Sequence, residues 1–176
     1  MRSLRKPALL LALVAVIALA VPAVASASRL EYGGKLLPVG VNFNAVSHKV
    51  ITSFGQCSEW TVQEQITKND GTTVEGISAA AGTTRECSGS YPFYTVEPRW
   101  NSFTSTTPGK GTVSMSYEMV SVVHCRYSGA ALPFTYILGS NEITFNNVKL
   151  DGGLCGTQYF SGTFALTIGG VPVILK

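Results

Sequence analysis

Apolar and polar residues alternate along much of the chain, and a period of two is typical of a β-strand with one buried face. Between residues 58 and 68, the apolar positions of this pattern are Trp60, Val62 and Ile66, with the polar Glu64 between the last two. This segment is therefore predicted to form a strand.

Turn-forming residues follow this strand at once. Residues 69–71 are Asn-Asp-Gly. Asn and Asp tolerate the left-handed backbone conformation and Gly favours it, so this sequence predicts a hairpin turn. Residues 72–78 are expected to form the returning strand.

The same alternation recurs farther along the chain. One apolar face runs from Val113 to Cys125, which is long for a single strand, so we expect a bend or bulge within it. The phase of the pattern slips at residues 146–147, which suggests another bulge. Further strands are predicted over residues 37–43, 143–150, 159–168 and 171–175.

Strands separated by frequent turn signals, with almost no helical pattern, favour an all-β fold. We predict an antiparallel β-sandwich, Ig-like or jelly-roll-like, and a closed β-barrel is the alternative. Loops such as residues 105–111 are rich in Gly, Ser, Thr and Pro. Because no linker-like stretch follows the first 27 residues, residues 28–176 are expected to form one secreted domain.

Residues 1–27 have the pattern of a secretory signal peptide. Three basic residues near the start precede an apolar run that ends in small residues. We place the cleavage site after Ala27, and cleavage after Ala25 is the close alternative. A membrane-spanning helix is the other interpretation, but Pro22 and the small-residue ending favour cleavage. The protein is therefore expected to be secreted, in the extracellular space.

The charge balance changes when the expected leader is removed. The whole chain has 13 basic and 10 acidic residues, and three of the basic residues lie in the leader. The remaining domain is formally neutral, which gives no reason to expect nucleic acid, or a membrane after signal cleavage, as a partner. The expected partner is an unknown extracellular polymer or protein.

Four cysteines, Cys57, Cys87, Cys125 and Cys155, follow the leader. An even number of cysteines in an exported chain predicts disulfides. Pairing of Cys57 with Cys87 and of Cys125 with Cys155 would close two loops of equal length, and we favour it over the two other pairings. A zinc site is poorly supported because the chain has no Cys-x-x-Cys motif.

Several short motifs are spaced along the domain. They are Cys57-Ser58-Glu59, Cys87, Pro98-Arg99-Trp100, Cys125-Arg126-Tyr127-Ser128-Gly129, Leu154-Cys155 and Ser161-Gly162-Thr163. In this order they resemble small secreted four-cysteine all-β proteins of unknown function from high-GC Gram-positive bacteria. That family tends to have Pro and Trp adjacent, whereas Arg99 separates them here. The resemblance implies an all-β secreted domain and no activity.

The sequence contains no cluster of residues that predicts catalysis. His48 and His124 are expected on strand surfaces, and there is no Gly-x-Ser-x-Gly motif. The ten acidic residues are scattered, without the paired spacing that would suggest glycoside hydrolysis. We therefore predict a non-enzymatic domain with no catalytic, cofactor-binding or metal site. A secreted hydrolase with a site assembled from scattered residues is the alternative.

Residues 90–103 hold five aromatic side chains. Tyr91 and Phe93 share one face of a strand, and Tyr94 shares the other face with Trp100 if the strand continues. Packing of these rings in the core is the preferred interpretation, because burial of a Trp or Phe contributes about 2–3 kcal/mol. The alternative is an exposed ligand platform of Tyr91, Tyr94 and Trp100 that suits a sugar or a peptide.

Together these observations predict an exported binding or surface domain. Its ligand is unknown, and a wall or matrix polysaccharide and a protein are both compatible with the pattern. A self-assembling extracellular structural subunit is a further alternative.

Overall fold

The computed structural model describes residues 28–89 and 93–176. Within these ranges 74% of the residues lie in β-strands, and the helical part is one short turn, η1 (Gly153–Cys155). The all-β class predicted from the sequence is therefore confirmed. The expected leader, residues 1–27, and Tyr91 of the aromatic stretch lie outside the described residues.

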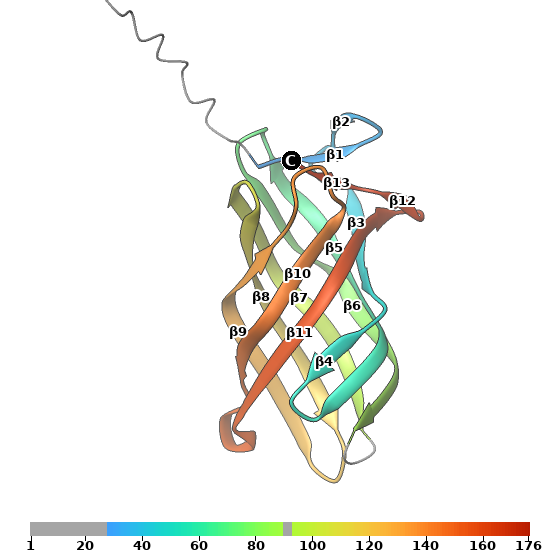
Figure 1. Ribbon diagram of the computed structural model, residues 1–176, viewed down its shortest axis with the longest axis vertical. Helices are drawn as coiled ribbons and strands as arrows, with labels where there is room; N and C mark the ends of the chain where they lie inside the picture. The colour runs from blue at the N-terminus through green and yellow to red at the C-terminus, as the bar shows by residue number, and fades with distance from the viewer. Residues whose placement is uncertain (1–27, 90–92) are drawn as a thin grey trace, which may run out of the picture.

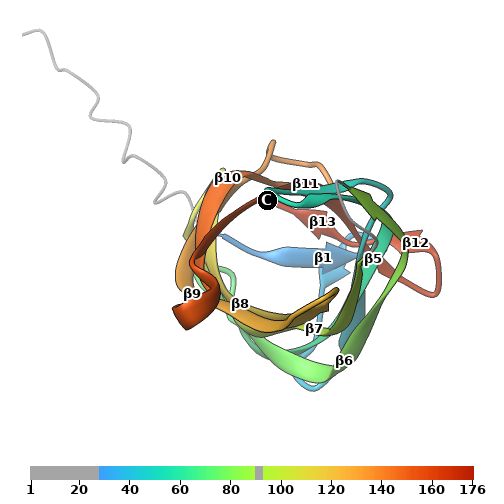
Figure 2. The ribbon, with the colours of Figure 1, turned by 90° about the horizontal axis from the view of Figure 1, so that it is seen from below.

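One closed antiparallel sheet forms an eight-stranded barrel, in which β3 and β4 act as a single interrupted strand (Figures 1 and 2). Each strand from β5 to β11 pairs with the next along the chain, while β3 and β4 pair with both β5 and β11 and so close the ring. The strands are β3 (Asn42–Ser47), β4 (Val50–Thr52), β5 (Gly55–Asn69), β6 (Val74–Gly89), β7 (Tyr94–Thr107), β8 (Lys110–Val120), β9 (His124–Thr135), β10 (Glu142–Asp151) and β11 (Thr157–Ile168).

The barrel corrects the β-sandwich that we preferred from the sequence, and the closed barrel named as the alternative is the fold that forms. β10 pairs with both β9 and β11, so the sheet has no break at which a second layer begins. A strand with one buried and one exposed face gives the same alternation in a sandwich and in a barrel. The pattern of apolar positions therefore did not separate the two.

Bulges bend the long strands around the barrel axis. Glu97 and Asn147 adopt positive φ angles of 49° and 51° at positions where the strand register shifts. The bulge at Asn147 confirms the predicted slip at residues 146–147. The bend expected between Val113 and Cys125 is instead a hairpin, because β8 ends at Val120 and β9 begins at His124. The apolar pattern continues across the turn because both strands face the same interior.

A small sheet closes one end of the barrel (Figure 2). It consists of β1 (Leu30–Tyr32), β2 (Lys35–Leu36) and β13 (Ile174–Leu175), and β12 (Val171–Pro172) precedes β13 on the edge of the barrel. The Asn69 side chain ties β5 to this sheet, since it donates to the carbonyls of Leu30 and Leu37 at 2.8 and 2.9 Å. We call this the closed end.

The interior is filled by large side chains rather than by a channel, as expected for a barrel of eight strands. Trp60 and Trp100 are each 1% exposed, and both make edge-to-face contacts with neighbouring rings. Such ring pairs contribute about 0.5–1.5 kcal/mol beyond the burial of their area. The fully buried rings are those of Trp60, Trp100, Tyr117, Tyr127, Phe43, Phe103, Phe134, Phe145, Phe160 and Phe164.

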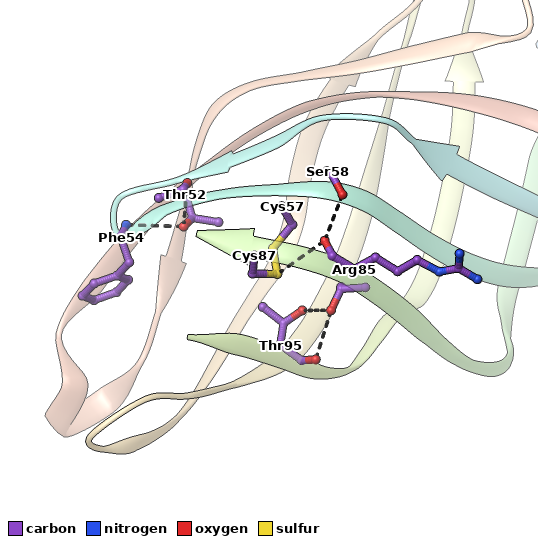
Figure 3. Close-up of a disulfide and its surroundings, with 9 residues drawn as sticks. Thr52, Phe54, Cys57, Ser58, Arg85, Cys87 and Thr95 are labelled. Atoms are coloured by element: carbon purple, nitrogen blue, oxygen red, sulfur yellow. Dashed lines mark hydrogen bonds between the residues drawn. A yellow bond between two sulfur atoms is a disulfide. The ribbon is translucent and has the colours of Figure 1, made fainter. Parts of the chain in front are cut away.

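Both disulfides form with the predicted pairing. Cys57 and Cys87 join β5 to β6 (Figure 3), and Cys125 and Cys155 join β9 to η1. Disulfides of this kind are typical of extracellular proteins. Both lie toward the end of the barrel opposite the closed end.

Candidate functional site

The turns at the end of the barrel opposite the β1–β2–β13 sheet are seen at the bottom of Figure 1, and several of them carry exposed apolar side chains. We call it the open end and define it by the β4–β5 turn, the β8–β9 turn and η1. Val122 and Val123 in the β8–β9 turn are 89% and 57% exposed, and Phe54 in the β4–β5 turn is 39% exposed. Leu154 in η1 is also exposed. Because turns usually carry polar residues and glycine, this group of apolar side chains indicates a binding surface.

A pocket of about 330 Å³ lies between the β4–β5 and β8–β9 turns. Small-molecule sites typically have volumes of about 300–1,000 Å³. The buried part of its wall is made by Phe93 and Met119. The lining residues are Ser53, Phe54, Phe93, Met119, Ser121, Val122 and Val123, and all of these side chains are uncharged.

The β4–β5 turn is held in place by hydrogen bonds. The Ser53 amide donates to the Tyr159 carbonyl at 3.2 Å, and the Tyr159 amide donates to Ser53 Oγ at 2.9 Å. The Phe54 amide donates to Thr52 Oγ1 at 3.3 Å, and Figure 3 shows the Phe54 ring at the tip of this turn, beyond the disulfide. The backbone that carries Phe54 is therefore fixed against β11.

A layer of buried polar groups lies beneath the pocket. Met119 pairs with Cys125 across β8 and β9, and the next inward-facing pair is Tyr117 with Tyr127. The ring of Phe54, which lines the pocket, has its centroid 6.1 Å from that of Tyr127. Tyr127 is therefore one layer deeper than the pocket and packs against its wall.

Two hydrogen-bond donors in this layer have no partner among the described residues. They are Tyr127 Oη and Gln158 Nε2, and both residues are fully buried. The Tyr117 hydroxyl donates to Gln158 Oε1, so the amide nitrogen of Gln158 is left free. A buried donor without an acceptor costs about 1–3 kcal/mol, which makes these two atoms candidates for contact with a bound molecule.

Burial keeps both phenols of this layer protonated. Loss of solvation raises the pKa of Tyr117 well above its ordinary value, with a further contribution from Tyr127, and burial also raises the pKa of Tyr127. Each phenol therefore remains a neutral donor at physiological pH. The Tyr127 ring also packs closely against Gly152, since a Cβ on residue 152 would lie 2.4 Å from Tyr127 Cε1.

Glu64 is a separate buried polar group, nearer the closed end. Neither of its carboxyl oxygens has a partner among the described residues. The carboxyl fills the space beside Gly76, where a Cβ would lie 3.8 Å from Glu64 Oε2 and 3.7 Å from Phe103 Cβ. Burial in these surroundings raises the pKa of Glu64 to about 9. The side chain is therefore a neutral acid at pH 7 and belongs to the core rather than to the open end.

Of the alternative ligand platform of Tyr91, Tyr94 and Trp100, the two described residues, Tyr94 and Trp100, do not share a surface. Trp100 is 1% exposed and packs against three Phe rings at centroid distances of 5.1–6.3 Å. Tyr94 is 57% exposed on the outer wall. The two residues face opposite sides because the bulge at Glu97 reverses the phase of β7. Trp100 is thus a core residue, as preferred, and Tyr91 lies outside the described residues.

The two histidines are both exposed and lie apart in the fold, one in the β3–β4 connection and the other at the start of β9. His48, between β3 and β4, lines a shallow groove that also contains Lys49 and Glu142. His124 on β9 places its Nε2 2.8 Å from Glu118 Oε2. Across residues 28–89 and 93–176, no group of three His, Cys, Asp or Glu side chains is arranged to hold a metal ion.

Sequence reasoning missed the residues of the open end. The pattern assigns Val122 and Val123 to one long strand, because Val123 keeps the alternation of the face from Val113 to Cys125. The available signal was Val122, an apolar residue at a position that the alternation between Met119 and Cys125 assigns to the opposite face. Phe54 carried a similar signal, since it lies in a Ser-Phe-Gly turn.

Within the part of the chain that the structure describes, no helix is both long and apolar enough to span a membrane. Comparisons with protein-family models, with curated proteins and with solved structures found no match. The interpretation of the open end therefore rests on the chemistry of its own residues.

Proposed function

We propose that the chain is an exported, non-enzymatic binding domain whose open end holds an apolar ligand. The observation that carries this proposal is the uncharged pocket of about 330 Å³ between Phe54 and the Val122–Val123 turn. Export is supported by the leader pattern of the first 27 residues and by the two disulfides.

The location of the ligand follows from the packing of the barrel. The interior is occupied by aromatic rings, so a ligand binds at the mouth rather than in a central channel. Val122 and Val123 expose apolar surface there, and covering such surface contributes about 25 cal/mol per Å². An apolar molecule or apolar group is therefore favoured as the ligand. A polysaccharide is less favoured, because Trp100 of the expected sugar platform is buried in the core.

Calorimetric titration of the exported protein with butylbenzene, an uncharged apolar probe, tests this function. We expect saturable binding, and we expect Val123→Asp to weaken it by about tenfold or more because a carboxylate would replace apolar surface that the ligand covers. Ile137→Asp is the matched control, since Ile137 is 80% exposed in the β9–β10 connection at the closed end. An absence of saturable binding, or equal losses in the two variants, would contradict the proposal.

A further inference from the structure

We propose that the ligand of the open end is an uncharged apolar molecule that carries a carbonyl group, and that the carbonyl oxygen accepts hydrogen bonds from Tyr127 and Gln158. This inference rests on the proposed binding function of the open end. It adds the chemical class of the ligand and the direction in which the ligand enters.

The hydrogen-bonding requirement comes from the layer beneath the pocket. Tyr127 Oη and Gln158 Nε2 are both donors, both fully buried and both without an acceptor among the described residues. At the closed end the comparable hydroxyl of Tyr136 is satisfied, because it lies 3.2 Å from Ser28 Oγ and 3.3 Å from Ser105 Oγ. Trp100 Nε1 and the Glu64 carboxyl are also buried without a partner among the described residues, but they lie elsewhere in the core. Tyr127 Oη and Gln158 Nε2 share the layer beneath the pocket, where an acceptor on the ligand complements them.

Phe54 controls the route from the pocket to these donors. Its ring lines the pocket and also packs against the Tyr127 ring. The side chain is 39% exposed, so it can turn toward solvent, and partly exposed side chains change rotamer within picoseconds to nanoseconds. Rotation of Phe54 away from Tyr127 joins the pocket to the polar layer without movement of the backbone, which stays hydrogen-bonded to Thr52.

The absence of charge in the pocket lining indicates which class of ligand the site favours, a neutral carbonyl compound or a carboxylate. No Lys or Arg side chain is among the residues that line the pocket. A buried carboxylate without a cationic partner carries a large desolvation cost, whereas a ketone or ester oxygen needs only the two donors. The site therefore favours ketones, esters or amides with an apolar body over fatty-acid anions.

Three small probes separate these possibilities. Butylbenzene and propyl phenyl ketone have the same shape and differ by the replacement of one methylene group with a carbonyl, and phenylbutyrate supplies a carboxylate. Only the ketone can accept hydrogen bonds from the two donors, so we expect it to bind about tenfold more tightly than butylbenzene, or more. Phenylbutyrate is expected to bind more weakly than either neutral probe.

Two variants assign the contact. Tyr127→Phe removes only the hydroxyl, and it should reduce the preference for the ketone over butylbenzene, because one of the two donors is lost. Tyr136→Phe, the matched change at the closed end, should leave the preference intact. The ratio of the two Kd values in the unmodified protein is a second measurement that does not depend on the folding of a variant.

The outcomes distinguish this inference from the function on which it rests. Equal Kd values for the ketone and butylbenzene, or a preference that is undiminished in Tyr127→Phe, would overturn the carbonyl contact but not the apolar site. Failure of every probe to bind would overturn both. Cosedimentation with phosphatidylcholine vesicles in the absence of probe binding would identify a lipid surface as the occupant, which would also overturn the inference.

Discussion

The ring of Phe54 packs against the ring of Tyr127, with the two centroids 6.1 Å apart. One residue lines the pocket at the open end and the other carries a buried hydroxyl without a partner among the described residues. Because Phe54 is partly exposed, we predict that Phe54→Ala lowers the free energy of unfolding by about 1 kcal/mol or less. The same change should weaken binding of butylbenzene, because it removes part of the pocket wall. Chemical denaturation and calorimetry measure the two effects separately, and a loss of stability above about 3 kcal/mol would show that Phe54 is a core residue instead.

Trp100 and Tyr94 provide a contrasting pair on β7. We predict that Trp100→Ala lowers the free energy of unfolding by about 3–5 kcal/mol, because it removes a buried ring that contacts three Phe side chains. Tyr94→Ala is the matched control on the outer wall and should cost less than about 1 kcal/mol. Similar losses in the two variants, measured by urea denaturation, would be inconsistent with the bulge at Glu97 that separates their faces.

Glu64 gives the barrel a predicted dependence on pH. Its pKa is raised to about 9 in the folded state from an ordinary value of 4.5, so between these values the folded state keeps a proton that the unfolded chain releases. The contribution of the Glu64 carboxyl to the free energy of unfolding is therefore fully present below pH 4.5 and is lost as the pH rises toward 9. The expected slope is about 1.4 kcal/mol per pH unit.

Glu64→Gln should remove this slope, because the amide does not titrate. Glu142→Gln is the control, since it changes an exposed carboxyl on β10. The measurement is the free energy of unfolding between about pH 5 and pH 9, taken as the difference between each variant and the unmodified protein. If the Glu64→Gln protein loses stability with rising pH as steeply as the unmodified protein, the conclusion that Glu64 is a buried neutral acid is wrong.

The disulfides should both contribute to stability through the unfolded state. Each closes a loop with a sequence separation of 30 residues, and the chain-entropy model gives about 3–4 kcal/mol for loops of this length. We predict that the Cys57→Ala, Cys87→Ala double variant and the Cys125→Ala, Cys155→Ala double variant each lose a comparable amount. Peptide mapping of the unreduced protein should show no free thiol, and peptides that cross-link the two pairs would refute the connectivity.

The sequence predicted the strands and the disulfides because these depend on local pattern and on an even number of cysteines. Trp60, Val62 and Ile66 indicated one buried face, and the structure places all three in the core. Closure of the sheet was not predictable in the same way, since it depends on the pairing of β11 with β3 and β4. These contacts join segments far apart in the chain, and the period-two pattern does not encode them.

The candidate site was missed for a related reason. A bulge residue such as Glu97 shifts the phase of a strand without any mark in composition, so Tyr94 and Trp100 were assigned to one face. The alternation assigns the apolar turn at Val122–Val123 to a strand, because Val123 is in phase with the residues on both sides of it. Only the hairpin geometry places those valines beside Phe54, which is 68 residues or more away along the chain.

The central claim is that an apolar ligand binds at the open end, and methyl NMR spectroscopy during titration with propyl phenyl ketone tests it most directly. The account predicts shifts of the Met119, Val122 and Val123 methyl signals, while the signals of Ile137 and Leu138 at the closed end stay in place. Shifts confined to the closed end, or spread evenly over the outer wall, would contradict it.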